Sequence, residues 1–492
     1  MPGKFEGPFL VGQSESDYII YEREQGRLPD PAALAIRKEF APKSDPSFAA
    51  DCTYVCFSLH CNNMRYNNGF FDICNRESGL RRPRRYARQF SANQGIVMQL
   101  DLYAELKGHN DHVSSMEFNS SGDLLVSGAY DNQVIFWNWE TKTRRLSYDP
   151  GNLKNVQQAK IMPLTNDRRI VTACGDGQVR LGEVLEDGQV HTKRLVSHRG
   201  AVHKLAVEPG NPNIIYSCGD YSFVQHFDLR SNSATKLFSC TRLIRGEPHS
   251  GTLDLYQMVF DPSNLNYFCL GGNDAYARVY DIRKCWQDRS SSLVKPVNTF
   301  RPAHLIYPHH FMITGLAYSN SSELLVSYSD ELIYLFQKHM GLSPPLFQPE
   351  DMEEVDKPAQ FVGHRNGNIC RVNFFGPNDE YVLSGSYCGH IFIWKKNGGE
   401  LVCVMTGDSL NVYDIQPHPH NPVIATCGSE NNLKLWAPVA NDDASPLPDD
   451  IAEIMESNRQ ARIDSYMPFF ASENHYQRMR GQSNGDATSE ER

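Results

Sequence analysis

The sequence predicts an all-β protein whose main part is a seven-bladed β-propeller, with irregular or helical N- and C-terminal extensions. Short runs of alternating apolar residues are separated by turn residues roughly every 8–12 positions, which is typical of antiparallel strands. This strand-and-turn pattern recurs about every 50 residues, close to the period of a four-stranded propeller blade. The predicted units end at Trp137, Gly182, Phe227, Tyr280, Phe336, Trp394 and Trp436.

The first unit contains a set of polar residues that can form a buried hydrogen-bonded network. His109, Ser127, Asp131 and Trp137 stand where WD-repeat blades carry such a set, although the Trp-Asp dipeptide itself never occurs in this chain. The turn position of Asp131 is held in other units by Asp176, Asp274, Tyr221, Cys388 and Glu430. Buried networks stabilise only when every member is satisfied. We therefore expect uneven blades, with the third and sixth depending more on packing.

A strand that closes the ring must come from the segment before His109. Gln94 to Leu106 (QGIVMQLDLYAEL) can supply the outer strand of the last blade. Closure of the ring removes exposed sheet edges, which would otherwise pair with other chains. We therefore place the propeller at residues 94–437.

Two extensions and one long loop lie outside the repeats. Residues 1–93 form an N-terminal extension, and residues 438–492 combine an acidic linker, short helices and a disordered tail. Residues 338–360 are rich in Pro, Asp and Glu and predict a flexible loop between the fifth and sixth blades. Asp449 or Asp450 can cap a helix in the C-terminal extension. The apolar face of that helix would consist of Ile451, Ile454 and Met455.

The overall composition excludes several classes of protein. The 492 residues contain no run of about 18 apolar residues and no secretory pattern at the N-terminus, so no membrane span or export is expected. The odd number of cysteines, 13, favours reduced thiols and a location in the nucleus and cytoplasm. The net charge of −10 argues against general nucleic-acid binding.

Five potential metal ligands cluster near the N-terminus: Cys52, Cys56, His60, Cys61 and Cys74. Zinc needs about four such ligands, usually in closely spaced pairs, and no CxxC occurs here. We interpret them as structural or free thiols, and no metal or cofactor is expected.

Catalysis is not expected of this chain. His418 and His420 lie among prolines in PHPHNP, in a turn that enters the last blade, where repeat structure accounts for them. No nucleophile elbow and no phosphate-binding loop is present in the sequence.

Two sixteen-residue stretches, 215–230 and 268–283, end alike. Each closes with an aromatic residue, Asp, an apolar residue and Arg: Phe-Asp-Leu-Arg at Arg230 and Tyr-Asp-Ile-Arg at Arg283. One interpretation is that each arginine covers its blade edge or pairs with a local carboxylate. However, equivalent strand ends of neighbouring blades lie on one face, and Arg suits protein interfaces. We therefore predict a paired docking contact.

The two stretches resemble the paired WDxR boxes of substrate receptors of cullin-four RING ubiquitin ligases. Longer blocks resemble the eighth member of the damaged-DNA-binding-protein-one- and cullin-four-associated factors, and its plant-type relatives, over roughly residues 77–440. These blocks include ARQFSANQGIVMQLDLYAELKGH, RIVTACGDGQVR, VEPGNPNIIYSCG, TGLAYSNSSELLVSYSDELIYLF, VNFFGPNDEYVLSGSYCGHIFIW and PHPHNPVIATCG.

This resemblance implies a non-catalytic receptor that recruits an unknown protein substrate to the ligase. Asp228, Arg230, Asp281 and Arg283 match the residues that contact the adaptor, damaged-DNA-binding protein one. The aromatic residues of the two boxes are Phe and Tyr instead of Trp. The alternative is a WD-repeat scaffold of another nuclear or signalling complex, which would need no adaptor.

A basic segment, residues 76–88, precedes the ring. It is a solvated linker, a nuclear-import signal, or, as in related receptors, a helical segment that adds contacts to the adaptor. Pro83 would interrupt a continuous helix. The basic residues are Arg81, Arg82, Arg84, Arg85 and Arg88.

Overall fold

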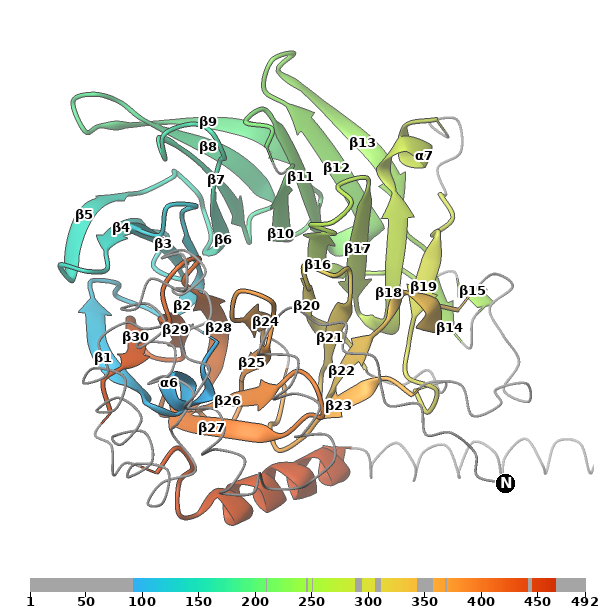
Figure 1. The fold of residues 1–492 in the computed structure, drawn as a ribbon. Helices are drawn as coiled ribbons and strands as arrows, with labels where there is room; N and C mark the ends of the chain where they lie inside the picture. Colours follow the sequence, from blue (N-terminus) through green and yellow to red (C-terminus); the bar gives the residue numbers. More distant parts are fainter. Residues whose placement is uncertain are drawn as a thin grey trace, which may run out of the picture. The chain divides into compact units, whose positions relative to one another are not determined.

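A computed structural model describes residues 92–465 apart from 209, 245–246, 250, 288–293, 306–310, 343–356, 368–369 and 441–444. Within these residues the chain forms seven four-stranded antiparallel sheets arranged as the blades of a propeller (Figure 1). The predicted fold class is therefore confirmed. The N-terminal cysteines and the basic segment 76–88 lie outside the described residues.

Each blade is a meander whose strands follow one another from the centre of the ring outwards, except in the last blade. The inner two strands of the blades are β2 (Val113–Phe118) and β3 (Leu124–Ala129), β6 (Val156–Ile161) and β7 (Arg169–Cys174), β10 (Val202–Val207) and β11 (Ile214–Gly219), β16 (Leu255–Phe260) and β17 (Tyr267–Gly272), β20 (Ile313–Tyr318) and β21 (Leu324–Tyr328), β24 (Val372–Phe375) and β25 (Tyr381–Gly385), and β28 (Val412–Pro417) and β29 (Ile424–Gly428).

The outer two strands carry the predicted unit ends on the third strand of every blade. These pairs are β4 (Val134–Asn138) and β5 (Thr143–Tyr148), β8 (Gln178–Val184) and β9 (Val190–Ser197), β12 (Phe223–Asp228) and β13 (Ser233–Ser239), β18 (Asp274–Asp281) and β19 (Asn298–Phe300), β22 (Ile333–Phe336) and β23 (Ala359–Phe361), β26 (His390–Lys395) and β27 (Leu401–Thr406), and β30 (Asn432–Pro438) and β1 (Leu100–Lys107). A small hairpin, β14 (Arg242–Ile244) with β15 (Glu247–His249), lies between the third and fourth blades.

The last blade closes the ring with a strand from before the first blade, as predicted. β1 pairs antiparallel with β30, and Leu106 lies opposite Leu433. The predicted strand is shorter than expected, because its first part forms the helix α6 (Gln94–Met98). The Asn93 side chain accepts a hydrogen bond from the Gly95 backbone N–H at 2.8 Å, which caps that helix and separates it from the strand.

The core lies between neighbouring blades. Second strands such as β3 and β11 are buried at every residue, since each is packed on both faces. Their sequences, LLVSGA and IIYSCG, are therefore apolar or small throughout instead of alternating. The outer strand β5 faces solvent and is mostly exposed until Tyr148.

The polar network predicted for the first blade is present. The His109 ring lies 2.7 Å from Ser127 Oγ through Nε2 and 3.0 Å from Asp131 Oδ2 through Nδ1. Trp137 donates its indole N–H to the same Ser127 oxygen at 2.9 Å. In the sixth blade, by contrast, His364 is fully buried and neither ring nitrogen has a hydrogen-bond partner among the described residues. The described part of the sixth blade therefore lacks this network, as the sequence suggested, whereas in the third blade the His198 ring still lies 2.8 Å from Ser217 Oγ.

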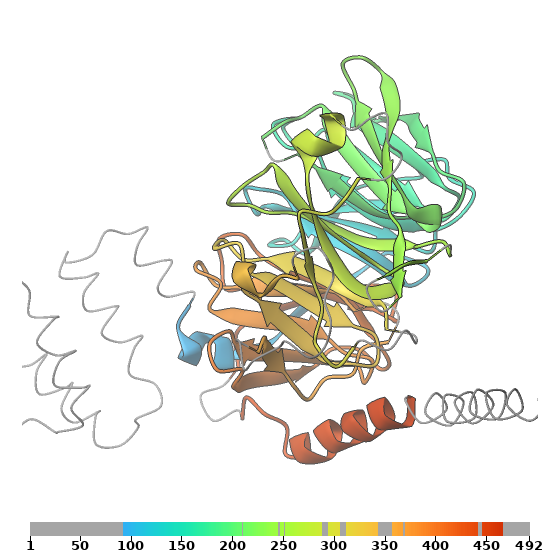
Figure 2. The ribbon, with the colours of Figure 1, turned by 90° about the vertical axis from the view of Figure 1, so that its right-hand side faces the viewer.

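The segment 338–360 and the C-terminal extension both contain regular structure in their described parts. The segment 338–360, expected to be a loop, begins with a 3-10 helix, Lys338–Met340, and its end belongs to β23. A helix spans residues 451–465 in the C-terminal extension and packs Ile451 and Ile454 on the core between the fifth and sixth blades. Figure 2 shows this helix, in red, along the edge of those blades. No described helix has the length and apolar character that crossing a membrane requires.

Candidate docking face

The two predicted boxes adopt the same local geometry. In the third blade, Asp228 Oδ1 accepts hydrogen bonds from the Arg230 backbone N–H at 2.9 Å and from Nε at 3.1 Å, while Oδ2 accepts from Nη2 at 3.0 Å. In the fourth blade, Asp281 receives the corresponding three bonds from Arg283 at 3.0, 3.0 and 2.8 Å. Each carboxylate thus holds both its own turn and one edge of a guanidinium.

Strand pairing brings each box to the same place in its blade. The Leu229 backbone N–H, one residue after β12, donates to the Asn213 carbonyl oxygen at 2.9 Å. The Ile282 N–H, one residue after β18, donates to the Asn266 oxygen at 2.8 Å in the same way. Third strands run in the same direction in every blade, so both arginines leave the ring on one face. We call this face, at the ends of β12 and β18, the arginine face.

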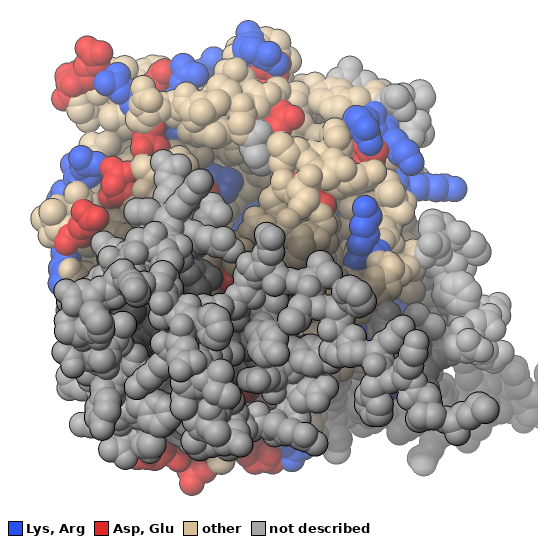
Figure 3. All heavy atoms as spheres, in the orientation of Figure 1, with Lys and Arg blue, Asp and Glu red and all other residues tan. Residues whose placement is uncertain are grey.

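A helix links the two boxes. Directly after β18 the chain forms α7 (Ile282–Gln287), which carries Arg283. Trp286 on α7 contacts His226 on β12 edge-on, with ring centroids 4.6 Å apart. Since His226 stands two residues before Asp228, this contact ties the position of the second box to that of the first. Figure 3 shows Lys and Arg side chains gathered on the part of the described surface where α7 lies.

The arginines remain available to a partner although both are paired. Their side chains are 64% (Arg230) and 59% (Arg283) exposed, whereas Asp281 is only 5% exposed. The hydrogen-bonded guanidinium lowers the pKa of Asp228 and of Asp281 below the ordinary value. Both carboxylates therefore stay ionised at neutral pH and keep their hydrogen bonds to Nε and Nη2 of the arginines. We call these two pairs, Asp228 with Arg230 and Asp281 with Arg283, the Asp–Arg forks. The local pairing considered from the sequence is real, but it orients the guanidinium groups without burying them.

The aromatic residues of the boxes belong to the core. Phe227 packs between the second and third blades, and Tyr280 packs between the third and fourth. Tyr280 stacks on Phe268 with ring centroids 5.7 Å apart, and its hydroxyl lies 3.6 Å from Cys240 Sγ. The Phe and Tyr that replace Trp thus fix the strand end from which each box projects.

Other residues singled out in the sequence have structural roles or lie on different faces. The His418 and His420 rings contact the carbonyl oxygens of Gly122 and Ser120 at 2.8 and 3.0 Å, so both histidines join the last blade to the first. The segment 338–360 leaves the ring after β22, a third strand, and therefore begins on the arginine face.

The C-terminal helix contacts the other face. Asn458 donates to the Gly363 carbonyl oxygen at 2.9 Å and to Cys388 Sγ at 3.2 Å. Arg462 donates to the carbonyl oxygen of His364. Gly363 precedes the first strand of the sixth blade and Cys388 precedes its third strand, which places both at the end of the ring opposite the arginine face.

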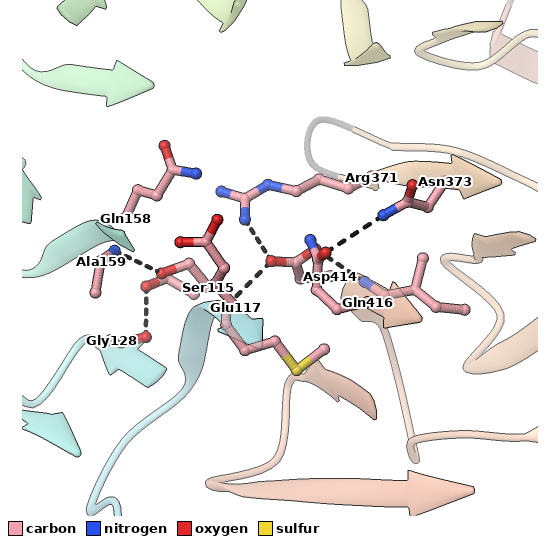
Figure 4. A network of polar contacts seen from close by, with 12 residues as sticks. Ser115, Glu117, Gly128, Gln158, Ala159, Arg371, Asn373, Asp414 and Gln416 are labelled. Carbon is pink, nitrogen blue, oxygen red and sulfur yellow. Dashed lines mark hydrogen bonds and ion pairs between the residues drawn. The ribbon is translucent and has the colours of Figure 1, made fainter. Parts of the chain in front are cut away.

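Sequence reasoning did not identify a polar network on the inner strands. Arg371 donates to Asp414, which also accepts from the Gln416 side chain at 3.1 Å (Figure 4). Glu117 pairs with Lys160 from the next blade. The sequence did contain a signal for this network. The innermost predicted strands repeatedly carry a charged or amide residue between the apolar residues that face the core.

Comparison with known proteins shows repeats of one family in this chain. The profile described as "WD domain, G-beta repeat" matches residues 100–138, 356–395 and 399–437. Each segment spans the outermost strand of one blade and the inner three strands of the next: β1 with β2 to β4, β23 with β24 to β26, and β27 with β28 to β30. The chain therefore contains WD40 repeats, and the structure shows that they belong to a seven-bladed ring.

Three curated relatives are each similar to more than half of this chain. Protein ALTERED SEED GERMINATION 2 from Arabidopsis thaliana is 30% identical over 280 residues, 51% of this chain and 37% of the relative. DDB1- and CUL4-associated factor 6 from Homo sapiens is 27% identical over 311 residues, 60% of this chain and 35% of the relative. WD and tetratricopeptide repeats protein 1 from Homo sapiens is 27% identical over 293 residues, 54% and 42% of the two chains.

The chain spans well under half of the length of each of these relatives. The similarity supports a relationship to WD-repeat proteins that include a DDB1- and CUL4-associated factor. The more specific resemblance to the eighth member of that group stays a prediction.

Proposed function

We propose that this chain is a non-catalytic substrate receptor of a cullin-four ubiquitin ligase and docks on the adaptor, damaged-DNA-binding protein one, through Arg230 and Arg283. The observation that carries the proposal is the pair of identical Asp–Arg forks on neighbouring blades of one face. The name of one relative, DDB1- and CUL4-associated factor 6, supports the choice of partner.

The geometry suits docking in two respects. Each guanidinium is exposed, permanently charged and held by its carboxylate, so little side-chain freedom remains to be lost on binding. The two forks also sit on a rigid base, because Trp286 and His226 connect them. A rigid two-point contact fixes the orientation of the propeller as well as its affinity. A bound target would then stay close to the ubiquitin-transfer machinery carried by the other subunits.

The opposite face, with the C-terminal helix, is the proposed side for a protein target. Docking at the arginine face leaves this side free. The basic residues Arg81, Arg82, Arg84, Arg85 and Arg88 lie outside the described residues and remain a proposed accessory contact or nuclear-import signal.

The test is binding of purified adaptor to the full chain and to the variant Arg230→Ala/Arg283→Ala. Loss of an interface arginine weakens binding by roughly thirtyfold or more when the residue is a hot spot. We therefore expect the double variant to lose measurable binding while its thermal unfolding temperature stays unchanged, since neither side chain packs in the core.

The matched control removes two positive charges elsewhere on the same face. Lys142 lies in the turn between the third and fourth strands of the first blade, and Arg168 is exposed beside Glu186 in the second. The variant Lys142→Ala/Arg168→Ala should bind like the wild type. Equal weakening by both double variants would show that only net charge matters and would contradict a specific docking contact.

The alternative function is a WD-repeat scaffold of another complex. It predicts no adaptor binding by the wild-type chain. Direct binding by the wild type therefore separates the two functions before any variant is made.

A further inference from the structure

The inner strands place one layer of side chains towards the axis of the ring. In six blades the register of the first two strands shifts at one point, and the residue after this shift pairs with a small or thiol residue on the second strand. In the sixth blade, Arg371 directly precedes Val372, the first paired residue. The members of this layer are Ser115, Gln158, Lys204, Gln257, Gly315, Arg371 and Asp414.

The carboxylates in and beside this layer already have donors. Asp414 is buried and receives hydrogen bonds from Arg371 and from the Met116 backbone N–H, the latter at 3.2 Å. Glu117, in the next layer, pairs with Lys160 and accepts from the Ile161 N–H at 3.0 Å. Neither carboxylate therefore needs a further cation.

Several donors in the same layer have no acceptor. Lys204, from the third blade, makes no hydrogen bond or ion pair with any described residue and is partly exposed. Arg371 is 8% exposed, and its Nε is buried without a hydrogen-bond partner within the described chain. The Gln158 amide oxygen accepts from the Leu205 backbone N–H at 2.8 Å, which leaves its NH₂ group as a donor. Figure 4 shows the Gln158 amide and the Arg371 guanidinium pointing towards one another.

The lowered pKa of Lys204 also supports an anion site. Burial, and then the positive charge of Arg371, lower the pKa of Lys204 to about 7, although the nearby Asp414 carboxylate acts in the opposite direction. A lysine whose charged form is disfavoured inside a protein regains its charge when an anion binds beside it. The arrangement thus offers hydrogen-bond donors and positive charge from three blades.

We propose that Lys204, Gln158 and Arg371 form a binding site for one oxyanion, a carboxylate or a phosphate group, among the inner strands of the propeller. A carboxylate would come from an acidic side chain or chain end of a bound protein, and a phosphate from a free or phosphorylated ligand. Both present the same oxygen acceptors to the three donor groups. The site does not depend on the proposed adaptor contact, because it lies on the inner strands and involves neither box.

The experiment measures how fast Lys204 is acetylated by a trace of acetic anhydride at pH 7 in the full chain. Four media of equal ionic strength contain chloride, acetate, inorganic phosphate, or the peptide acetyl-Glu-Glu-Glu-amide in chloride. Peptide mapping by mass spectrometry reports the modification of each lysine. The exposed Lys193 on β9 serves as the internal reference.

Lys204 should react readily in chloride and about fivefold more slowly with a bound oxyanion, since a one-unit rise of a pKa near 7 reduces the neutral amine by about that factor. Lys193 should react equally in all media. Protection by phosphate alone assigns a phosphate ligand, and protection by acetate and the peptide assigns a protein carboxylate. Lys204 that resists acetylation in chloride, or that reacts equally in all four media, overturns the proposal.

A variant provides a second check. Gln158→Glu keeps the oxygen that accepts from Leu205 and adds a carboxylate beside Lys204. In this variant Lys204 should already react slowly in chloride and show no response to added anions. Fast, anion-sensitive acetylation of Lys204 in Gln158→Glu would place the anion elsewhere and contradict the site.

Discussion

The carboxylates of the two forks should control how well the arginines dock. Asp228→Asn and Asp281→Asn keep the size of the side chain and leave one oxygen to accept the backbone N–H of the box turn. The other oxygen becomes an NH₂ group, which faces Nη2 of the arginine, a donor, at a former distance of 3.0 or 2.8 Å. The guanidinium therefore loses its Nη2 bond and the attraction of the carboxylate charge, and only the Nε bond to a neutral amide oxygen remains, while the turn and the positive charge persist.

The size of the effect follows from the side-chain freedom that is restored. An arginine that has lost its charged, two-bond partner must be ordered again when the adaptor binds, which weakens binding by roughly two- to twelvefold per long side chain. The double variant should therefore bind roughly 5- to 150-fold more weakly than the wild type. This loss is smaller than that expected for removal of both arginines, which also deletes their contacts.

Biolayer interferometry with purified adaptor can measure both Kd and the rate constants. Positive charge is gained in the Asn variants, so long-range attraction to an acidic partner should not fall, and the loss should appear mainly in koff. Binding by the double Asn variant that equals the wild type would refute a positioning role for the carboxylates. Binding as weak as that of Arg230→Ala/Arg283→Ala would show instead that the carboxylates themselves contact the adaptor.

The blade networks and Lys204 give two further predictions. His109→Phe should destabilise the propeller by about 2–4 kcal/mol, because it leaves the buried Ser127 hydroxyl and the Asp131 carboxylate without the histidine as a partner. His364→Phe should cost less than about 1 kcal/mol, since neither His364 nitrogen has a partner among the described residues. Equal losses of the free energy of unfolding in urea would contradict this account. Lys204 has a folded-state pKa of about 7, below its unfolded value, so the unfolded chain binds more protons between about pH 7 and pH 10 and stability should rise with pH in that window. The stability of the wild type relative to Lys204→Met should therefore increase from pH 7 to pH 10, and a constant difference would refute the lowered pKa.

The sequence by itself determined the blades and the places where the arginines emerge. Alternation of apolar residues, turn residues and the repeat length are local properties, and each blade is a meander of neighbouring strands, so local patterns are sufficient to define it. The ends of β12 and β18 could be located in this way, and the shared direction of third strands then put Arg230 and Arg283 on one face.

Tertiary structure decided the features that depend on contacts between distant segments. The start of the predicted closing strand became α6, and part of the predicted loop became β23, because pairing with β30 and β22 selects the strand residues. The pairing of Arg371 with Asp414, which leaves Lys204 without a partner, exists only because ring closure brings the inner strands of separate blades together. No local sequence pattern shows which charged residues will pair, since the partner of a charge inside the ring is set by distances across the ring and not by distances along the chain.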